Sequence, residues 1–150
     1  EVKLDLPLDA NLSADYVPKE ELRLEAYRRL ADVTTDAEVD DIRTEWEDRY
    51  GPVPDAAAKL LDVARLRAEA HRLGVREINV TKGPAFGGPA WTARVSPIRL
   101  KASQTVRLTR LFKGAVYKED QELVTFPIPK TPDLAGTIVD LLRQLIPPGT

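Results

Sequence analysis

Apolar residues recur every three or four positions through most of the first half of the chain, which is the period of an amphipathic helix. Three helices are predicted there, over Lys19–Asp32, Thr35–Tyr50 and Asp55–Leu73. Before them, Val2–Leu6 alternates apolar and polar residues, as a half-buried strand does. The first half is therefore predicted to be a short strand followed by three helices.

The ends of these helices carry recognisable stop and start residues. Pro18 suits the start of the first helix. Thr35 and Glu38 have the spacing of a capping box, in which a hydroxyl and a carboxylate each bond to a free backbone amide. Gly51 and Gly74 supply the left-handed residue that commonly ends a helix. Local sequence thus predicts the helix boundaries independently of the apolar pattern.

From Glu77 onward the pattern changes to short apolar runs separated by glycine and proline. The runs Ile78–Thr81 and Trp91–Val95 flank a loop over residues 83–89 and predict a hairpin. The runs Ala115–Lys118 and Leu123–Ile128 predict a second antiparallel pair. These four strands point to a small antiparallel sheet.

Three further segments complete the second half. Ile98–Lys101 is expected to continue the sheet, and Ser103 to cap a short helix ending at Phe112. A last helix is expected to begin at Thr131 or Asp133 and to end before Pro147. The whole pattern predicts an α+β fold in one domain over residues 1–150, helical in 1–75 and strand-rich in 76–150.

Composition excludes several classes of protein. The 150 residues contain no cysteine, so there can be no disulfide framework, thiolate metal site or cysteine nucleophile. No apolar run approaches the roughly 20 residues that span a bilayer, and we expect a cytoplasmic protein with no membrane partner. The chain starts at Glu1 and has no methionine, which indicates a fragment or a processed product of a larger protein.

The residues of known catalytic motifs are missing or isolated. Gly83–Gly88 has glycines but lacks the Lys-Ser/Thr ending of a phosphate-binding loop. His71 is the single histidine, and a zinc site or a catalytic triad needs further partners. The acidic pairs Glu20–Glu21 and Asp40–Asp41 fall on predicted helix surfaces, where water competes for them. We therefore expect a non-catalytic chain with no cofactor and no metal.

Charge is distributed unevenly along the chain. Residues 1–75 hold 18 acidic residues against 11 Lys and Arg, whereas residues 76–150 hold 6 against 11. On the second predicted helix, four carboxylates recur at steps of three, four and three within an arc of about 80°. They are Glu38, Asp41, Glu45 and Asp48. This acidic strip is either a solvated helix face or a docking surface for a partner that presents arginine.

The second half contains a basic counterpart. No acidic residue occurs between Ile78 and Lys118, and eight Lys and Arg lie in the segment 82–118 together with Trp91 and Phe112. The candidates for contact with an anionic partner are Arg94, Arg99, Lys101, Arg107 and Arg110. Such a segment can bind nucleic acid through phosphate contacts and base stacking, or it can simply complement the acidic half of the same protein.

The residues also carry a resemblance to a known family. The opening EVKLDLPLDANLSADYVP, the Tyr-Arg-Arg run at 27–29, the Asp-Arg-Tyr-Gly-Pro-Val-Pro junction at 48–54 and the helix Leu60–Arg67 keep family order and spacing. Together they resemble the C-terminal domain of the bacterial transcription-repair coupling factor. The specific likeness covers Glu1–Val75, and beyond Arg76 only the general run of strands and helices matches.

That resemblance implies a function. Members of the family are large ATP-driven DNA translocases that remove stalled RNA polymerase and recruit nucleotide excision repair. Their ATP- and Mg²⁺-binding motifs lie in the motor, outside this chain. Their C-terminal domain is regulatory: it docks on an N-terminal UvrB-like module, covers the surface that binds UvrA and represses the protein.

A domain that docks reversibly needs a charged contact that water can re-enter, and the resemblance therefore favours docking through the acidic strip. Glu45 is the first choice because it lies in the middle of the strip. The rival hypothesis is an accessory domain that contacts DNA through the segment 82–118.

Overall fold

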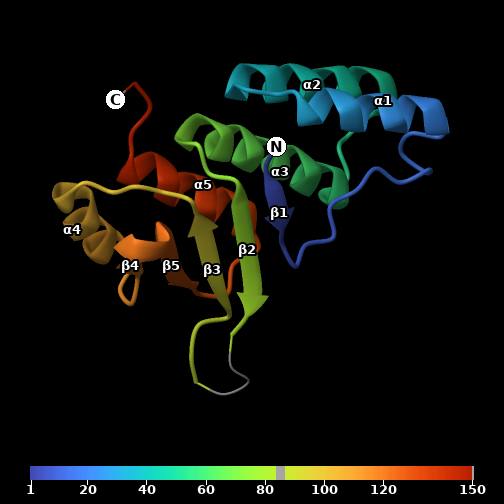
Figure 1. Cartoon of the computed structure of the whole chain (residues 1–150). Helices are drawn as coiled ribbons and strands as arrows, with labels where there is room; N and C mark the ends of the chain where they lie inside the picture. The colour runs from blue at the N-terminus through green and yellow to red at the C-terminus, as the bar shows by residue number, and fades with distance from the viewer. Residues whose placement is uncertain (84–86, 150) are drawn as a thin grey trace. The chain divides into compact units, whose positions relative to one another are not determined.

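Five strands form one mixed sheet in the order β1-β2-β3-β5-β4 in the computed structural model, which describes residues 1–83 and 87–149 (Figure 1). The strands are β1 (Lys3–Asp5), β2 (Glu77–Lys82), β3 (Trp91–Ser96), β4 (Val116–Lys118) and β5 (Leu123–Ile128). The helices are α1 (Glu20–Ala31), α2 (Asp36–Tyr50), α3 (Asp55–Leu73), α4 (Ala102–Leu111) and α5 (Leu134–Leu145), with a 3₁₀ turn η1 (Glu119–Gln121). The predicted α+β fold is confirmed.

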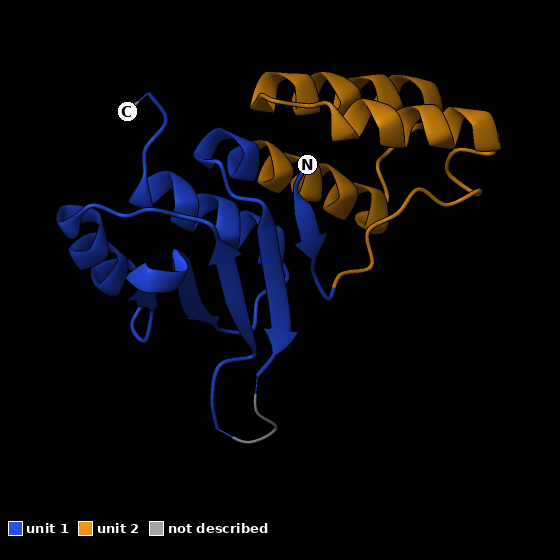
Figure 2. Ribbon diagram, viewed as in Figure 1, with its two compact units in different colours: residues 1–7, 69–150 blue, residues 8–68 orange. Residues whose placement is uncertain are grey.

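The chain divides into two compact units (Figure 2). Residues 1–7 and 69–150 form the sheet unit, and residues 8–68 form the helical unit. The dividing point lies inside α3. That one domain spans residues 1–150 stays a prediction.

The sheet unit has one apolar and one polar sheet face, because side chains alternate along each strand. Ile78, Val95 and Val124 lie opposite one another on β2, β3 and β5 and are buried. The helix α5 adds Ile138 and Leu141 to the buried residues of this unit. The other face carries a row across the sheet whose members, in strand order, are Asp5, Asn79, Arg94, Thr125 and Val116.

β1 pairs in parallel with β2, with Leu4 opposite Ile78. The sequence predicted a strand here, but not that it would join a sheet whose other pairs are antiparallel. The backbone N–H of Lys3 donates to the carbonyl of Arg76 over 2.8 Å, which brings the start of the chain to the start of β2. The N-terminal residues therefore belong to the sheet unit and not to the helices that follow them.

The helical unit is built around a cluster of buried apolar residues from α1, α2, α3 and the segment before α1. These residues are Leu12, Tyr16, Val17, Leu30, Val33, Val39, Ile42, Trp46, Ala57, Leu61 and Ala64. The Tyr16 hydroxyl donates to the carbonyl of Gly51 over 2.9 Å, and Gly51 has a φ of +90° at the end of α2. Burial raises the pKa of Tyr16, and the nearby Glu47 adds to that effect.

Two predictions about the second half are wrong. Ile98–Lys101 is not a strand, because its amides are bonded outside the sheet ladder: Ile98 donates to the carbonyl of Glu122 over 2.8 Å, and Leu100 donates to the hydroxyl of Tyr117 over 3.2 Å. Ser103 is not a cap but lies inside α4. The Gln104 side chain accepts from the Lys101 amide instead, over 2.8 Å.

The sequence left open whether the last helix begins at Thr131 or at Asp133. Asp133 is the cap, and its carboxylate accepts from the amide of Gly136 over 3.1 Å. Thr131 lies outside the helix and accepts from the Asp133 amide. Part of the predicted hairpin loop, residues 84–86, lies outside the described residues. No helix among the described residues has the length and apolar character to cross a bilayer.

Candidate partner-docking site

The acidic strip lies on α2, on the flank away from the buried Val39, Ile42 and Trp46. Glu38, Asp41 and Asp48 are exposed, and Glu45 is half-buried. The predicted arc is thus a surface of the helical unit. The structure distinguishes its four carboxylates, however, by what each one contacts.

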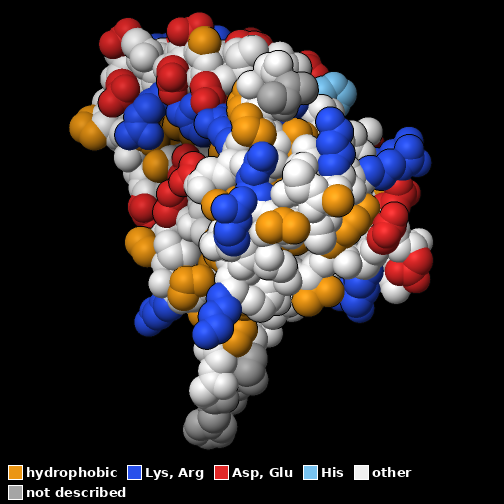
Figure 3. All heavy atoms as spheres, turned by 90° about the vertical axis from the view of Figure 1, so that its left-hand side faces the viewer, with side chains coloured by type: hydrophobic (Ala, Val, Ile, Leu, Met, Phe, Trp, Pro, Cys, Tyr) orange, Lys and Arg blue, Asp and Glu red, His pale blue; other side chains and the backbone are white. Residues whose placement is uncertain are grey.

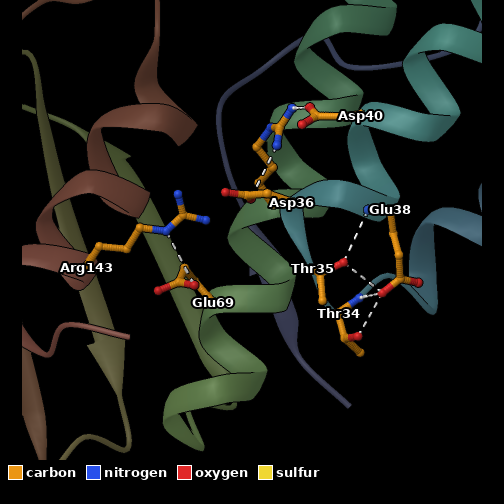
Figure 4. A network of polar contacts seen from close by, with 8 residues as sticks. Thr34, Thr35, Asp36, Glu38, Asp40, Glu69 and Arg143 are labelled. Atoms are coloured by element: carbon orange, nitrogen blue, oxygen red, sulfur yellow. Dashed lines mark hydrogen bonds and ion pairs between the residues drawn. The ribbon is translucent and has the colours of Figure 1, made fainter. Parts of the chain in front are cut away.

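Glu38 is engaged in capping α2 (Figure 4). Its carboxylate accepts from the hydroxyl of Thr34 over 2.9 Å, from the hydroxyl of Thr35 over 3.1 Å and from the amide of Thr34 over 3.3 Å. The Thr35 hydroxyl in turn accepts from the Glu38 amide over 3.2 Å. The hydrogen bonds from Thr34, followed by that from Thr35, lower the pKa of Glu38. This carboxylate already has a local structural function.

Glu45 forms an ion pair with Arg29 of α1. Both side chains remain partly exposed, at 42% for Glu45 and 50% for Arg29. The pair borders a small groove of about 50 Å³ between α1 and α2, whose lining includes Ala26 and Trp46. The central carboxylate of the strip, Glu45, is therefore already paired with a cation within the helical unit, but it is still partly exposed to solvent.

Asp41 and Asp48 are the open members of the strip. Neither carboxylate has a hydrogen bond or an ion pair with any described residue. They are seven positions apart, which corresponds to about two turns and a rise of about 10 Å along the helix. A partner could approach both carboxylates without first breaking a contact.

Sequence reasoning missed the acidic contacts on the opposite side of α2. Arg65 of α3 lies 3.2 Å from Asp36 and 2.5 Å from Asp40, and the two carboxylates converge on one guanidinium (Figure 4). Burial acts to lower the pKa of Arg65, but hydrogen bonds and charge from Asp40 and Asp36 outweigh it and raise this pKa. These acids hold α2 to α3. The i,i+4 spacing of Asp36 and Asp40 was the one available signal, and it does not identify their partner.

The five basic residues predicted to contact an anionic partner also differ in the contacts that they make. Arg99 pairs with Glu122, which raises the pKa of Arg99. Arg107 donates to the carbonyl of Leu145 over 2.9 Å. The remaining three are exposed and have no ion pair within the described residues; they are Arg94, Lys101 and Arg110. Arg94 lies on the polar sheet face, whereas Lys101 and Arg110 lie at the two ends of α4.

The two units differ in net charge. The sheet unit holds thirteen Lys and Arg against nine Asp and Glu, a net charge of +4. The helical unit holds nine against fifteen, a net charge of −6. On the side of the molecule that carries α4, Lys and Arg lie among exposed apolar side chains (Figure 3). Each unit thus presents a surface suited to partners of opposite charge.

The expected absence of a metal site stays a prediction for the whole chain. Within residues 1–83 and 87–149, no group of three or more His, Asp or Glu side chains is arranged to hold a metal ion. His71 is exposed in the last turn of α3.

The fold is that of a known class of domain. It is similar to the crystal structure of the C-terminal domain of transcription-repair coupling factor, with a TM-score of 0.79 over 97% of this chain and 91% of that one. The sequence identity is 15%, so this likeness shows a shared fold.

The sequence comparisons show the family. The family model of the TRCF domain matches residues 6–97 of this chain. The transcription-repair-coupling factor of Mycobacterium bovis is 40% identical over 136 residues, which cover 91% of this chain and 10% of that protein. The Escherichia coli factor is 38% identical over 78 residues, 52% of this chain and 7% of its own length.

The chain belongs to the TRCF domain family, as the residues of its first half predicted. The likeness to the mycobacterial factor also extends well past Arg76, where sequence reasoning found only a general pattern. The chain spans about a tenth of the length of that relative.

Proposed function

We propose that this chain is a non-catalytic, autoinhibitory docking domain of a transcription-repair coupling factor. Its partner is the UvrB-like N-terminal module of the same protein, and docking masks the surface of that module that binds UvrA. The parent would be an ATP- and Mg²⁺-dependent DNA translocase that removes stalled RNA polymerase and recruits excision repair. Family membership supports this role. The proposed docking surface is the acidic strip on α2.

One observation supports the docking surface most strongly. Asp41 and Asp48 are exposed and unpaired within the described residues, and they flank the partly exposed Glu45 at the α1/α2 groove. Carboxylates in this arrangement can accept hydrogen bonds from arginine side chains of a partner. The forked guanidinium suits bidentate pairing with a carboxylate. Exposed charges also keep such an interface reversible, since water can replace the partner at little cost.

The experiment measures binding of this chain to the UvrB-like module by isothermal titration calorimetry. The double variant Asp41→Lys/Asp48→Lys is expected to weaken binding at least tenfold, because it places like charges against the partner's arginines. The matched control is Asp120→Lys/Asp140→Lys, which makes the same change in net charge at two exposed acids of the sheet unit that have no ion pair in the described chain. Equal binding by the two variants would show that the strip does not dock.

If docking is too weak to measure between separate molecules, this chain and the UvrB-like module can be joined in one polypeptide. A short flexible linker gives an effective concentration near 1 mM. In the parent protein, the strip variant is expected to bind UvrA more tightly than the wild type does. Unchanged UvrA affinity would contradict the masking function.

A second candidate is contact with DNA through the sheet unit. It is supported by the net charge of +4 on that unit and by Arg94, Lys101 and Arg110, which are exposed and have no ion pair with any described residue. It predicts that the chain binds duplex DNA with an affinity that falls as salt rises. No binding at low salt and micromolar protein would exclude it.

A further inference from the structure

We propose that Arg29 sets the affinity of the docking surface by competing with the partner for Glu45. In the free domain Arg29 occupies this carboxylate, and it leaves when an arginine of the partner binds. The inference rests on the docking function proposed above. It adds the residue that keeps docking weak enough to be reversed.

The contacts of Glu45 make the competition direct. Its ion pair with Arg29 joins α2 to α1, and both side chains are about half exposed, so a partner can reach either one. A second guanidinium brought to the same carboxylate meets the like charge of Arg29 at close range. Like charges at that distance repel even when water partly screens them, so a second guanidinium binds Glu45 more weakly while Arg29 stays in place.

A second carboxylate, that of Glu25, is close enough to pair with Arg29. Glu25 lies one turn earlier on α1, is exposed, and has no ion pair in the part of the chain that the structure describes. Glu25 and Arg29 line the same groove as Glu45. A Glu four residues before a cation is the favourable order for such a pair on a helix. Exchange from Glu45 to Glu25 therefore keeps Arg29 paired.

The arrangement also selects the partner. Asp41 and Asp48 are open from the start and attract any cationic surface. Glu45 becomes available only to a group that can displace a guanidinium, and a second guanidinium with bidentate geometry is better suited to that than an ammonium. The strip is therefore expected to favour arginine over lysine at the position that faces Glu45.

The test compares Arg29→Gln with Arg28→Gln, each measured for binding to the UvrB-like module. Both variants remove one positive charge from the last turn of α1, but Arg28 is exposed and has no ion pair within the described residues. Arg29→Gln is expected to tighten binding about two- to fivefold more than Arg28→Gln, the size expected for a half-exposed ion pair. In a Glu45→Gln background the difference between the two is expected to disappear.

Two outcomes separate this inference from the docking function. If the wild-type chain does not bind the module even when joined to it, the docking function fails and the inference fails with it. If the wild type binds but Arg29→Gln binds no more tightly than Arg28→Gln, the inference alone is overturned. Circular dichroism of each variant shows whether the helical unit is intact, and Arg29→Lys, which keeps the charge with fewer donors, is expected to fall between the wild type and Arg29→Gln.

Discussion

Glu69 accepts two hydrogen bonds from Arg72, one turn later on α3, over 3.0 Å from Nε and 2.7 Å from Nη2. The Glu69 side chain is only 8% exposed, and Arg143 of α5 lies 3.5 Å from its other oxygen (Figure 4). Arg72 also donates to the carbonyl of Ile146 over 2.7 Å. One buried carboxylate therefore connects the end of α3 to α5 within the sheet unit.

Replacement of Glu69 by Ala is expected to lower the free energy of unfolding by about 2 kcal/mol. Removing one partner of a fully buried ion pair costs about 3–5 kcal/mol, and the loss here is smaller because Arg72 and Arg143 can rehydrate. Urea denaturation followed by circular dichroism measures the change. Glu77→Ala is the control, since its contact with Lys3 is 3.9 Å long and exposed, and it should cost less than about 1 kcal/mol. Equal costs would show that Glu69 does not hold α5.

Arg107 is expected to stabilise the sheet unit rather than to bind an anion. Its guanidinium donates to the Leu145 carbonyl at the C-terminal end of α5, where free carbonyls and the helix dipole favour a cation. Arg107→Ala is expected to lower the free energy of unfolding by about 1 kcal/mol. Arg110→Ala on the same helix is exposed and should change it by less than about 0.5 kcal/mol. The opposite ranking in thermal unfolding would return Arg107 to the candidate anion contacts.

Helix boundaries were predicted within one or two residues because the signals that set them are local. The Thr35 hydroxyl and the positive φ of Gly51 and Gly74 act within one turn of the residues they cap. The pairing of β1 with β2 could not be predicted, because more than 70 residues separate Leu4 from Ile78. Ile98–Lys101 has the alternating pattern of a strand but is not one. The Ile98 amide bonds to Glu122, next to η1, and the Leu100 amide bonds to Tyr117 on β4.

For the candidate docking site too, features set by nearby residues could be predicted, and contacts between distant residues could not. The acidic strip could be predicted because its four members share one helix and the helical period places them on one face. The contacts that separate open from occupied carboxylates come from other helices, from Arg29 on α1 and Arg65 on α3. Glu69 carries no sequence signal for its buried position, since it lies in a charged stretch that is typical of a solvated helix face.

Glu38 is expected to make the stability of the helical unit depend on pH. Its folded pKa is lowered by the hydrogen bonds from Thr34 and Thr35, so the folded state favours the ionised carboxylate. The stabilisation is present above the ordinary carboxyl pKa of 4.5 and is lost as pH falls through the lower folded pKa. Thr34→Ala removes the hydroxyl that contributes most, and the pKa of Glu38 should then move back toward 4.5. Titration of the Glu38 side-chain carboxyl by NMR measures this shift, with Ser13→Ala as a control outside the cap. A Glu38 pKa that is the same in wild type and Thr34→Ala would show that the cap does not hold the carboxylate, and Glu38 would then be open for docking like Asp41 and Asp48.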